Sequence, residues 1–155
     1  MIVKFFPMVP KRDWSLVKRE LGLKWVEDTR GIIAVDQVSG RVLAGCIFNN
    51  WTHNAVQVHF WISNPMVIRH GFFQEVCRYV FDVAGREKMV GMVPGDNAEA
   101  LKLDKHLGFR ETHRITGGYM YDVDYVILEA VRADLSRWLP QEEVVDGWER
   151  RTRRA

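Results

Sequence analysis

The chain has 155 residues, of which 47% are hydrophobic and 12% aromatic, and a formal net charge of +2 at pH 7. This length and composition are typical of one globular domain with a substantial core, and they exclude a disordered chain. The small net charge gives no general support for nucleic-acid binding. Because no apolar run approaches the roughly 18 residues of a membrane helix, we expect no membrane partner and a cytoplasmic location.

The first part of the chain predicts four strands and one helix. Residues Ile2 to Phe6 form a short strand, which Pro7 and Pro10 end. Asp13 is suited to cap a helix that ends at Gly22. Apolar runs then predict strands over Gly31 to Asp36, Arg41 to Phe48 and Val56 to Ser63, the first two joined by a hairpin with Gly40 at its tip.

The second part of the chain alternates helices and strands. A helix follows Gly71 and ends at Gly85, and a strand over Met89 to Val93 comes next. Because a helix joins this strand to the preceding one, the two strands should be parallel. A second helix begins at Asp96 or Asn97 and ends at Leu107-Gly108-Phe109. The last predicted elements are strands over Arg110 to Ile115 and Asp122 to Val131, around the Gly117-Gly118 turn, and a short helix over Ala133 to Leu139.

These elements predict one α/β domain over residues 1–140, with a mixed sheet of about six or seven strands. Residues 141–155 form a basic C-terminal tail, which is either a solvated terminus or a nucleic-acid contact. Cys46 and Cys77 lie in an apolar strand and on an apolar helix face, which favours buried free thiols. We therefore expect neither a disulfide nor a metal site.

The most specific pattern is the second predicted helix and its end, Asn97-Ala98-Glu99-Ala100-Leu101 through Leu107-Gly108-Phe109-Arg110. It resembles the N-x-x-A…L-G-F-R pattern of the GNAT N-acetyltransferases. The element order resembles that family over nearly the whole chain, most closely its branch of ribosomal-protein N-terminal acetyltransferases. The resemblance implies an α/β fold with a mixed, mostly antiparallel twisted sheet, a central parallel strand pair and helices on both faces.

The resemblance also implies an enzyme that uses acetyl-CoA as cosubstrate. It would transfer the acetyl group to a primary amine by direct attack in a ternary complex. The acceptor, whose identity the sequence does not give, is a protein N-terminus, a lysine or a small-molecule amine. The family implies either a monomer or a homodimer.

The family's pyrophosphate loop has the pattern Q/R-x-x-G-x-G/A, and the corresponding segment here keeps only the first glycine. The residues that would face the pyrophosphate are Arg69, His70, Gly71, Phe72 and Phe73. Free amides at the helix start would bind the anion, Gly71 would allow close approach and Arg69 would add charge. Phe73 either crowds this loop or turns inward.

Two further cofactor contacts follow from the resemblance. Trp61, Ile62 and Ser63 would bind the pantetheine arm through their main chain, as an added strand does. Asn97 would contact the cofactor arm, cap the second helix, or do both.

Acetyl transfer to an amine needs a group that accepts a proton and a group that donates one. Relatives carry a glutamate base where this chain has Gln57, which cannot act as a base. His59 lies two residues on, on the same face, and with an ordinary pKa of about 6.5 it is our preferred base, the alternative being a structural histidine. Relatives carry a tyrosine acid where this chain has Asp104, which could serve only with a raised pKa. Tyr119 is the hydroxyl we expect to act, with Tyr121 as an alternative.

The acceptor pocket is expected between the first helix and the last hairpin. Its walls would come from aromatic side chains, unless these pack in the core: Trp14, Trp25, Trp51, Trp61 and Tyr119. Two other functions stay open. Gln57, Phe73 and Asp104 would suit a catalytically impaired binding or structural protein on the same fold, and the arginine-rich tail alone would suit a nucleic-acid-binding module.

Overall fold

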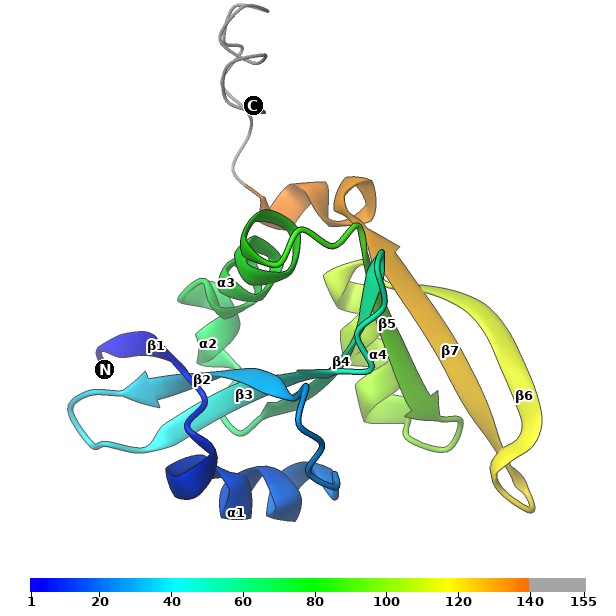
Figure 1. Ribbon diagram of the computed structural model, residues 1–155, viewed down its shortest axis with the longest axis horizontal. Helices are drawn as coiled ribbons and strands as arrows, with labels where there is room; N and C mark the ends of the chain where they lie inside the picture. Colours follow the sequence, from blue (N-terminus) through cyan, green and yellow to red (C-terminus); the bar gives the residue numbers. More distant parts are fainter. Residues whose placement is uncertain (140–155) are drawn as a thin grey trace, which may run out of the picture.

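The computed structural model describes residues 1–139 (Figure 1), and the predicted basic tail lies outside the described residues. Seven strands form one sheet in the order β1-β2-β3-β4-β5-β7-β6. They span Val3–Pro7 (β1), Arg30–Asp36 (β2), Val42–Asn49 (β3), Ala55–Ile62 (β4), Lys88–Pro94 (β5), Arg110–Met120 (β6) and Val123–Val131 (β7). All neighbours are antiparallel except β4 and β5, which are parallel, so the predicted fold class is confirmed.

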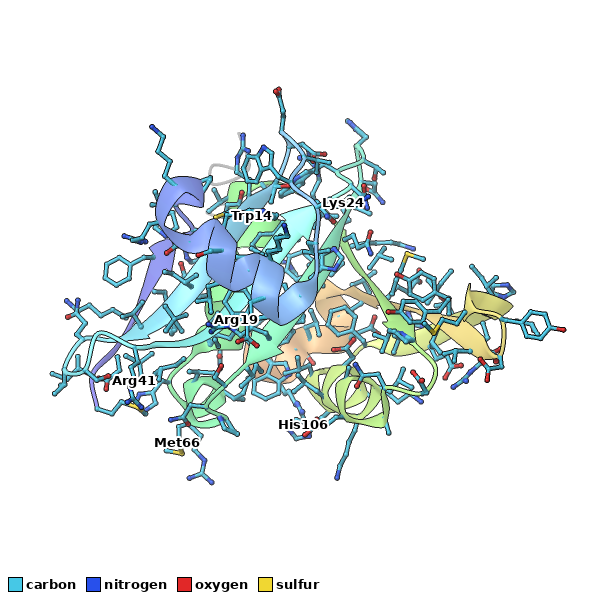
Figure 2. The ribbon with its side chains drawn as sticks, turned by 90° about the horizontal axis from the view of Figure 1, so that it is seen from below. Trp14, Arg19, Lys24, Arg41, Met66 and His106 are labelled. Carbon is cyan, nitrogen blue, oxygen red and sulfur yellow. The ribbon has the colours of Figure 1, made fainter. Side chains whose placement is uncertain are left out.

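Helices cover both faces of the sheet. They span Pro10–Leu21 (α1), Met66–Arg69 (α2), Phe72–Cys77 (α3) and Ala98–Leu107 (α4), with a π-helical segment over Arg78–Val83 (η1) that continues α3 and a 3-10 helix over Arg132–Trp138 (η2). Figure 1 shows α1 on one side of strands β2 to β4 and α3 on the other, with α4 beside β5. Seen from below, α1 with Trp14 and Arg19 crosses in front of the sheet (Figure 2).

The core consists of two apolar clusters separated by the sheet. Between the sheet and α3, the largest fully buried side chains include Phe48, Phe72 and Phe73. Between the sheet and α1 lie Val17 and Trp61 with their neighbours. Both cysteines are buried and unbonded, as predicted.

The start of α1 differs from the prediction. Val9 is the N-cap and Pro10 is the first helical residue, where proline is favoured because the missing N–H would have no partner there. Asp13 is therefore not the cap but lies in the first turn, and its Oδ2 accepts the N–H of Val9 at 2.7 Å. Gly22 ends the helix with φ 64°, as predicted.

Strand β6 is longer than predicted. It continues through Gly117 and Gly118 to Met120, with irregular register between Ile115 and Met120. The connection to β7 lies at Tyr121 and Asp122. Gly117 with φ 60° allows this distortion within the strand rather than marking its end.

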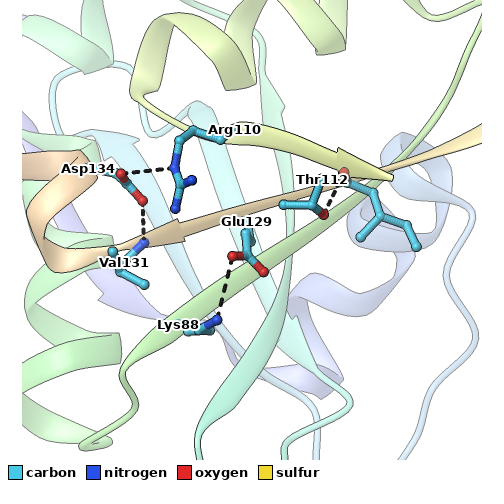
Figure 3. Close-up of polar contacts among 7 residues, drawn as sticks. Lys88, Arg110, Thr112, Glu129, Val131 and Asp134 are labelled. Atoms are coloured by element: carbon cyan, nitrogen blue, oxygen red, sulfur yellow. Dashed lines mark hydrogen bonds and ion pairs between the residues drawn. The ribbon is translucent and has the colours of Figure 1, made fainter. Parts of the chain in front are cut away.

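Strands β5, β6 and β7 form one half of the sheet. Polar contacts stabilise the end of this half-sheet where β5 and β6 begin and β7 ends (Figure 3). Lys88 on β5 lies 3.5 Å from Glu129 on β7. Asp134 on η2 accepts a hydrogen bond from Arg110 Nε at 3.1 Å and from the Val131 N–H at 3.0 Å. These bonds hold η2 against the start of β6, so the last described helix is part of the folded domain.

Candidate active site

The parallel pair β4 and β5 is joined over only three residue pairs. Ala55, Val56 and Gln57 lie opposite Lys88, Met89 and Val90, and no pairing follows. Beyond this point β4 stays paired with β3 as far as Ile62, and β5 stays paired with β7 as far as Pro94. The two strands therefore separate while each remains fixed from its other side.

The separation leaves main-chain groups of β4 facing an open gap. Ser63 donates its N–H to Leu43 O at 2.8 Å, on the β3 side. Because main-chain groups alternate between neighbours along a strand, those of Phe60 and Ile62 face β5. Of the three predicted pantetheine contacts, Ile62 thus has free main-chain groups in the gap, while Trp61 and Ser63 are bonded toward β3. Phe60 has the same main-chain orientation as Ile62, which the sequence does not reveal because strand phase is not visible in it.

A cleft of about 380 Å³ lies at this gap. Its walls come from both separating strands, the end of α1, α4 and the β6–β7 hairpin. The residues that line the cleft include His59, Phe60, Gly91, Asn97, Asp104, Tyr119 and Tyr125. The structure therefore places the predicted residues His59, Asn97 and Tyr119 around one cavity, together with Asp104.

His59 lies on the wall formed by β4. Its Nε2 is 2.8 Å from Oδ1 of the buried Asn49 on β3. Since an amide oxygen accepts, Nε2 carries the proton and Nδ1 keeps the lone pair. Burial lowers the pKa of His59 to about 4, so the ring is neutral at pH 7. Asn49, which fixes this tautomer, carries no recognisable signal in the sequence.

Asp104 lies on α4, on the opposite side of the cleft. It is only 7% exposed, and its carboxylate makes no hydrogen bond to residues 1–139. Its Oδ2 would lie 3.3 Å from a Cβ built on Gly91, so the absent side chain on β5 leaves room for the carboxyl group. Burial raises the pKa of Asp104 to about 7, which is the condition for this residue to act as an acid.

Tyr119 and Tyr125 form the rim of the cleft on the hairpin side. Their ring centroids are 5.6 Å apart, and Tyr119 is 51% exposed. Tyr121, the alternative hydroxyl, is fully exposed and does not border the cleft. Of the five aromatics expected around the acceptor, only Tyr119 borders this cleft. Trp61 packs under α1, and Trp14 contacts Trp25 edge to face, with ring centroids 5.0 Å apart.

Asn97 caps α4, since its Oδ1 accepts the Ala100 N–H at 3.1 Å. It also borders the cleft, so capping and a ligand contact are compatible at this position. Asp96 does not cap the helix.

The segment between β4 and α3 differs from the expected open loop, because residues Met66–Arg69 form the extra helical turn α2. Arg69 and His70 are exposed, and Gly71, with φ 89°, is the N-cap of α3. In Figure 2, Met66 on α2 and His106 on α4 lie along the same side of the molecule. The predicted helix start at Gly71 is thus correct, but a second turn precedes it.

Phe72 and Phe73 point into the core and are fully buried. Phe72 packs on Phe5, and Phe73 packs against Phe60, Phe109 and Trp138. Their side chains therefore neither crowd the loop nor touch a ligand in it. Only their N–H groups remain for the predicted role, and no hydrogen bond to residues 1–139 uses them.

Within the described residues, no group of three or more His, Cys, Asp or Glu side chains is arranged to hold a metal ion, and no helix is long and apolar enough to cross a membrane. No protein-family model and no curated protein sequence matches the chain. Solved structures do match it, and they identify the fold as that of the GNAT N-acetyltransferases.

Two of these structures illustrate the likeness. The spermidine/spermine N-acetyltransferase SpeG from Vibrio cholerae, solved with manganese ions, superposes with a TM-score of 0.70 at 10% identity, over 87% of this chain and 95% of that one. The ribosomal-protein-S5-alanine acetyltransferase from Vibrio fischeri has a TM-score of 0.58 at 15% identity, over 81% of this chain and 71% of that one. At these identities the likeness establishes the fold, and the activity must be argued from the cleft.

Proposed function

We propose that this protein is an N-acetyltransferase that transfers the acetyl group of acetyl-CoA to a primary amine. The observation that carries the proposal is the cleft between β4 and β5. Its β4 wall carries free main chain and the half-buried His59, and the buried Asp104 lies on the opposite wall. The GNAT fold of the chain supports the same reaction class.

The residues present fit acetyl-CoA in two places. The main-chain groups of Phe60 and Ile62 can pair with the amide-containing pantetheine arm, as an added strand would. At the start of α3, the free N–H groups of Phe72 and Phe73 lie beside Gly71, where a Cβ would meet only Gln74 Oε1, at 3.9 Å. That Oε1 is buried and can only accept a hydrogen bond, so the two N–H groups are the ones that would bind a phosphate oxygen.

Acetyl-CoA would supply the thioester. The amine nitrogen bonds to the carbonyl carbon, the carbon–sulfur bond breaks, and one proton moves from nitrogen to a base. His59 is neutral at pH 7 and keeps its Nδ1 lone pair, so it can accept this proton directly or through a water. A weak base suffices once attack has begun, because the nitrogen is then far more acidic than a free ammonium ion.

The departing thiolate must receive a proton. With a pKa of about 7, Asp104 carries one in about half of the molecules at pH 7 and can donate it. Asp104 therefore takes the role that the sequence assigned to Tyr119, and the exposed Tyr119 at the rim is suited to contact the acceptor. The class of the acceptor amine and the assembly as a monomer or homodimer remain predictions from the sequence.

The test combines binding and turnover. We expect calorimetry to show acetyl-CoA binding to wild type, Asp104→Asn and His59→Gln alike. Release of free thiol with a panel of amines should fall about 100-fold in each variant, because general acid–base groups contribute about 10²–10⁴-fold. Exposed residues of the same types provide matched controls, Asp96→Asn and His106→Gln, which should keep wild-type rates.

Unchanged turnover in Asp104→Asn would remove this residue from the mechanism. Absence of acetyl-CoA binding would overturn the proposed function as a whole. Binding without turnover for any amine would favour the second candidate, a catalytically impaired binding protein, which the extra turn α2 in the pyrophosphate segment supports.

A further inference from the structure

A second hollow, of about 730 Å³, lies away from the cleft. It is bounded by β1, the start of β2, the helix formed by α3 and η1, and the loop that follows α1. None of the residues that line it lines the β4–β5 cleft. A ligand bound in this hollow would therefore lie apart from the cleft proposed for acetyl transfer.

The walls of this hollow are mainly apolar. Phe5 and Ile32 line it, and two large side chains that border it, Phe6 and Trp25, are 37% and 43% exposed. Aromatic side chains left exposed around a depression are a usual sign of a binding site, because water contact with them is unfavourable. The body of a ligand that fits here is apolar.

Two hydroxyl groups on the wall have no partner among residues 1–139. Thr29 is only 3% exposed, and its buried Oγ1 makes no hydrogen bond. The Tyr79 hydroxyl also makes none, and burial raises its pKa, so it remains an uncharged donor. A buried hydroxyl without a partner is destabilising. Because Thr29 Oγ1 has almost no surface that solvent can touch, the half-buried Tyr79 hydroxyl is the one that a ligand can contact.

The net charge of the side chains that line the hollow is positive. Glu75 and Arg78 neutralise each other through hydrogen bonds of 2.6 and 3.0 Å. Arg30 has no acidic partner, since only its Nη1 is used, by the carbonyl oxygens of Thr29 and Glu27. Arg30 and Tyr79 both line the hollow, and the charges of Arg30 and Arg86 lower the pKa of Tyr79 against the larger effect of burial.

We propose that this hollow binds a monocarboxylic acid with an aromatic or aliphatic body. The apolar body packs between Phe5, Ile32 and Trp25. The carboxylate lies against Arg30, whose free N–H groups and positive charge complement it. The Tyr79 hydroxyl donates to a carboxylate oxygen.

The experiment uses 4-phenylbutyrate as the probe and the full chain. Calorimetry should show saturable binding with one site. Two analogues with the same body but another head, 4-phenylbutanol and 4-phenylbutylamine, should bind at least about tenfold more weakly, because a hydrogen bond to a charged group is worth about 1.5–3 kcal/mol. Amide chemical shifts should change at Thr29, Arg30 and Tyr79.

Variants separate the head contact from the fold. Arg30→Gln should weaken 4-phenylbutyrate about tenfold or more, and the exposed control Arg41→Gln on the far side of the β2–β3 hairpin should not. Tyr79→Phe keeps the ring and removes the hydroxyl, and it should weaken the probe about threefold to tenfold. Thr29→Val removes a hydroxyl that solvent does not reach, so it should raise the Tm of the free protein by a few degrees and leave the affinity unchanged.

Equal affinity for the acid and the amine would overturn the proposal, as would shift changes confined to the cleft. Asp104→Asn, which alters only the cleft, should leave binding of the probe unchanged. The result is thereby independent of whether the protein transfers acetyl groups.

Discussion

The half-buried His59 and the buried Asp104 border the same cleft, and removal from water moves their pKa values in opposite directions. The pKa of His59 falls from 6.5 to about 4, and that of Asp104 rises from 3.8 to about 7. Between about pH 4 and 6.5 both side chains are mainly uncharged in the folded protein, whereas both are mainly charged in the unfolded chain. In that range these two side chains add no net or paired charge to the cleft.

These two titrations affect stability with opposite signs. Over the range from about pH 4 to 6.5, the unfolded chain holds a proton on the imidazole that the folded protein lacks, so this group makes stability rise with pH. Over the range from about pH 4 to 7, the folded protein holds a proton on Asp104 that the unfolded chain lacks, so this group makes stability fall with pH. In wild type the two effects largely cancel.

Removing one group should expose the effect of the other. Relative to wild type, Asp104→Asn should gain stability as pH rises from 4.5 to 7.5, and His59→Gln should lose it. Each change is on the order of 1.4 kcal/mol for every pH unit between the folded and unfolded pKa values. Urea unfolding at several pH values measures both, and parallel curves for the two variants would contradict the assigned burial effects.

Some residues of the candidate site can be inferred from the sequence, and others cannot. His59, Asn97 and Tyr119, which the sequence indicates as site residues, all border one cavity in the structure, and their roles stay predictions. Asn49 and Gly91 were missed because they act through neighbouring strands, and register between strands is not encoded in a local pattern. The inward direction of Phe73 follows from core packing, which the single sequence left open.

Strand β4 combines a packing surface with an edge that β5 leaves unpaired beyond Gln57. Trp61, on its α1 face, lies flat over Gly45 of β3: a Cβ at Gly45 would be 2.0 Å from the ring. The glycine thus lets the indole approach the sheet, which holds the last part of β4 in place where β5 no longer supports it. The shape of the gap depends on this contact.

Gly45→Ala should therefore destabilise the protein by about 1–3 kcal/mol, because the added methyl group overlaps the ring. Trp61→Leu alone should also destabilise it, through loss of buried area. In the double variant Gly45→Ala/Trp61→Leu the methyl group finds space, so its destabilisation should be smaller than the sum of the two single effects. Strict additivity in chemical denaturation would show that the ring and Gly45 do not act together.

The number and order of helices and strands were largely predictable, because apolar periodicity, Gly22 and Gly108 mark most element ends. The extra turn α2 was not predictable, since Met66–Arg69 is too short to show periodicity. The start of α1 at Pro10 was assigned to Asp13, because a proline that ends a strand and one that begins a helix look alike in sequence.

For the protein as a whole, the sheet behaves as two half-sheets, β1 to β4 and β5 to β7, joined by three residue pairs. A ligand that pairs with β4 inside the gap would connect them. Acetyl-CoA at 100 times its Kd should therefore raise the free energy of unfolding by about 2.7 kcal/mol. It should also slow hydrogen exchange at Phe60 and Ile62, whereas slowing at the start of β6 alone would indicate another binding mode.

Each half-sheet is also continuous in sequence, since residues 3–62 contain β1 to β4 and residues 88–131 contain β5 to β7. Contacts close in sequence form early in folding because they cost less chain entropy. We expect each half to assemble mainly from its own segment and the three β4–β5 pairs to form as the halves dock. The β4–β5 junction, which leaves space for a ligand, would then be the last part of the sheet to form.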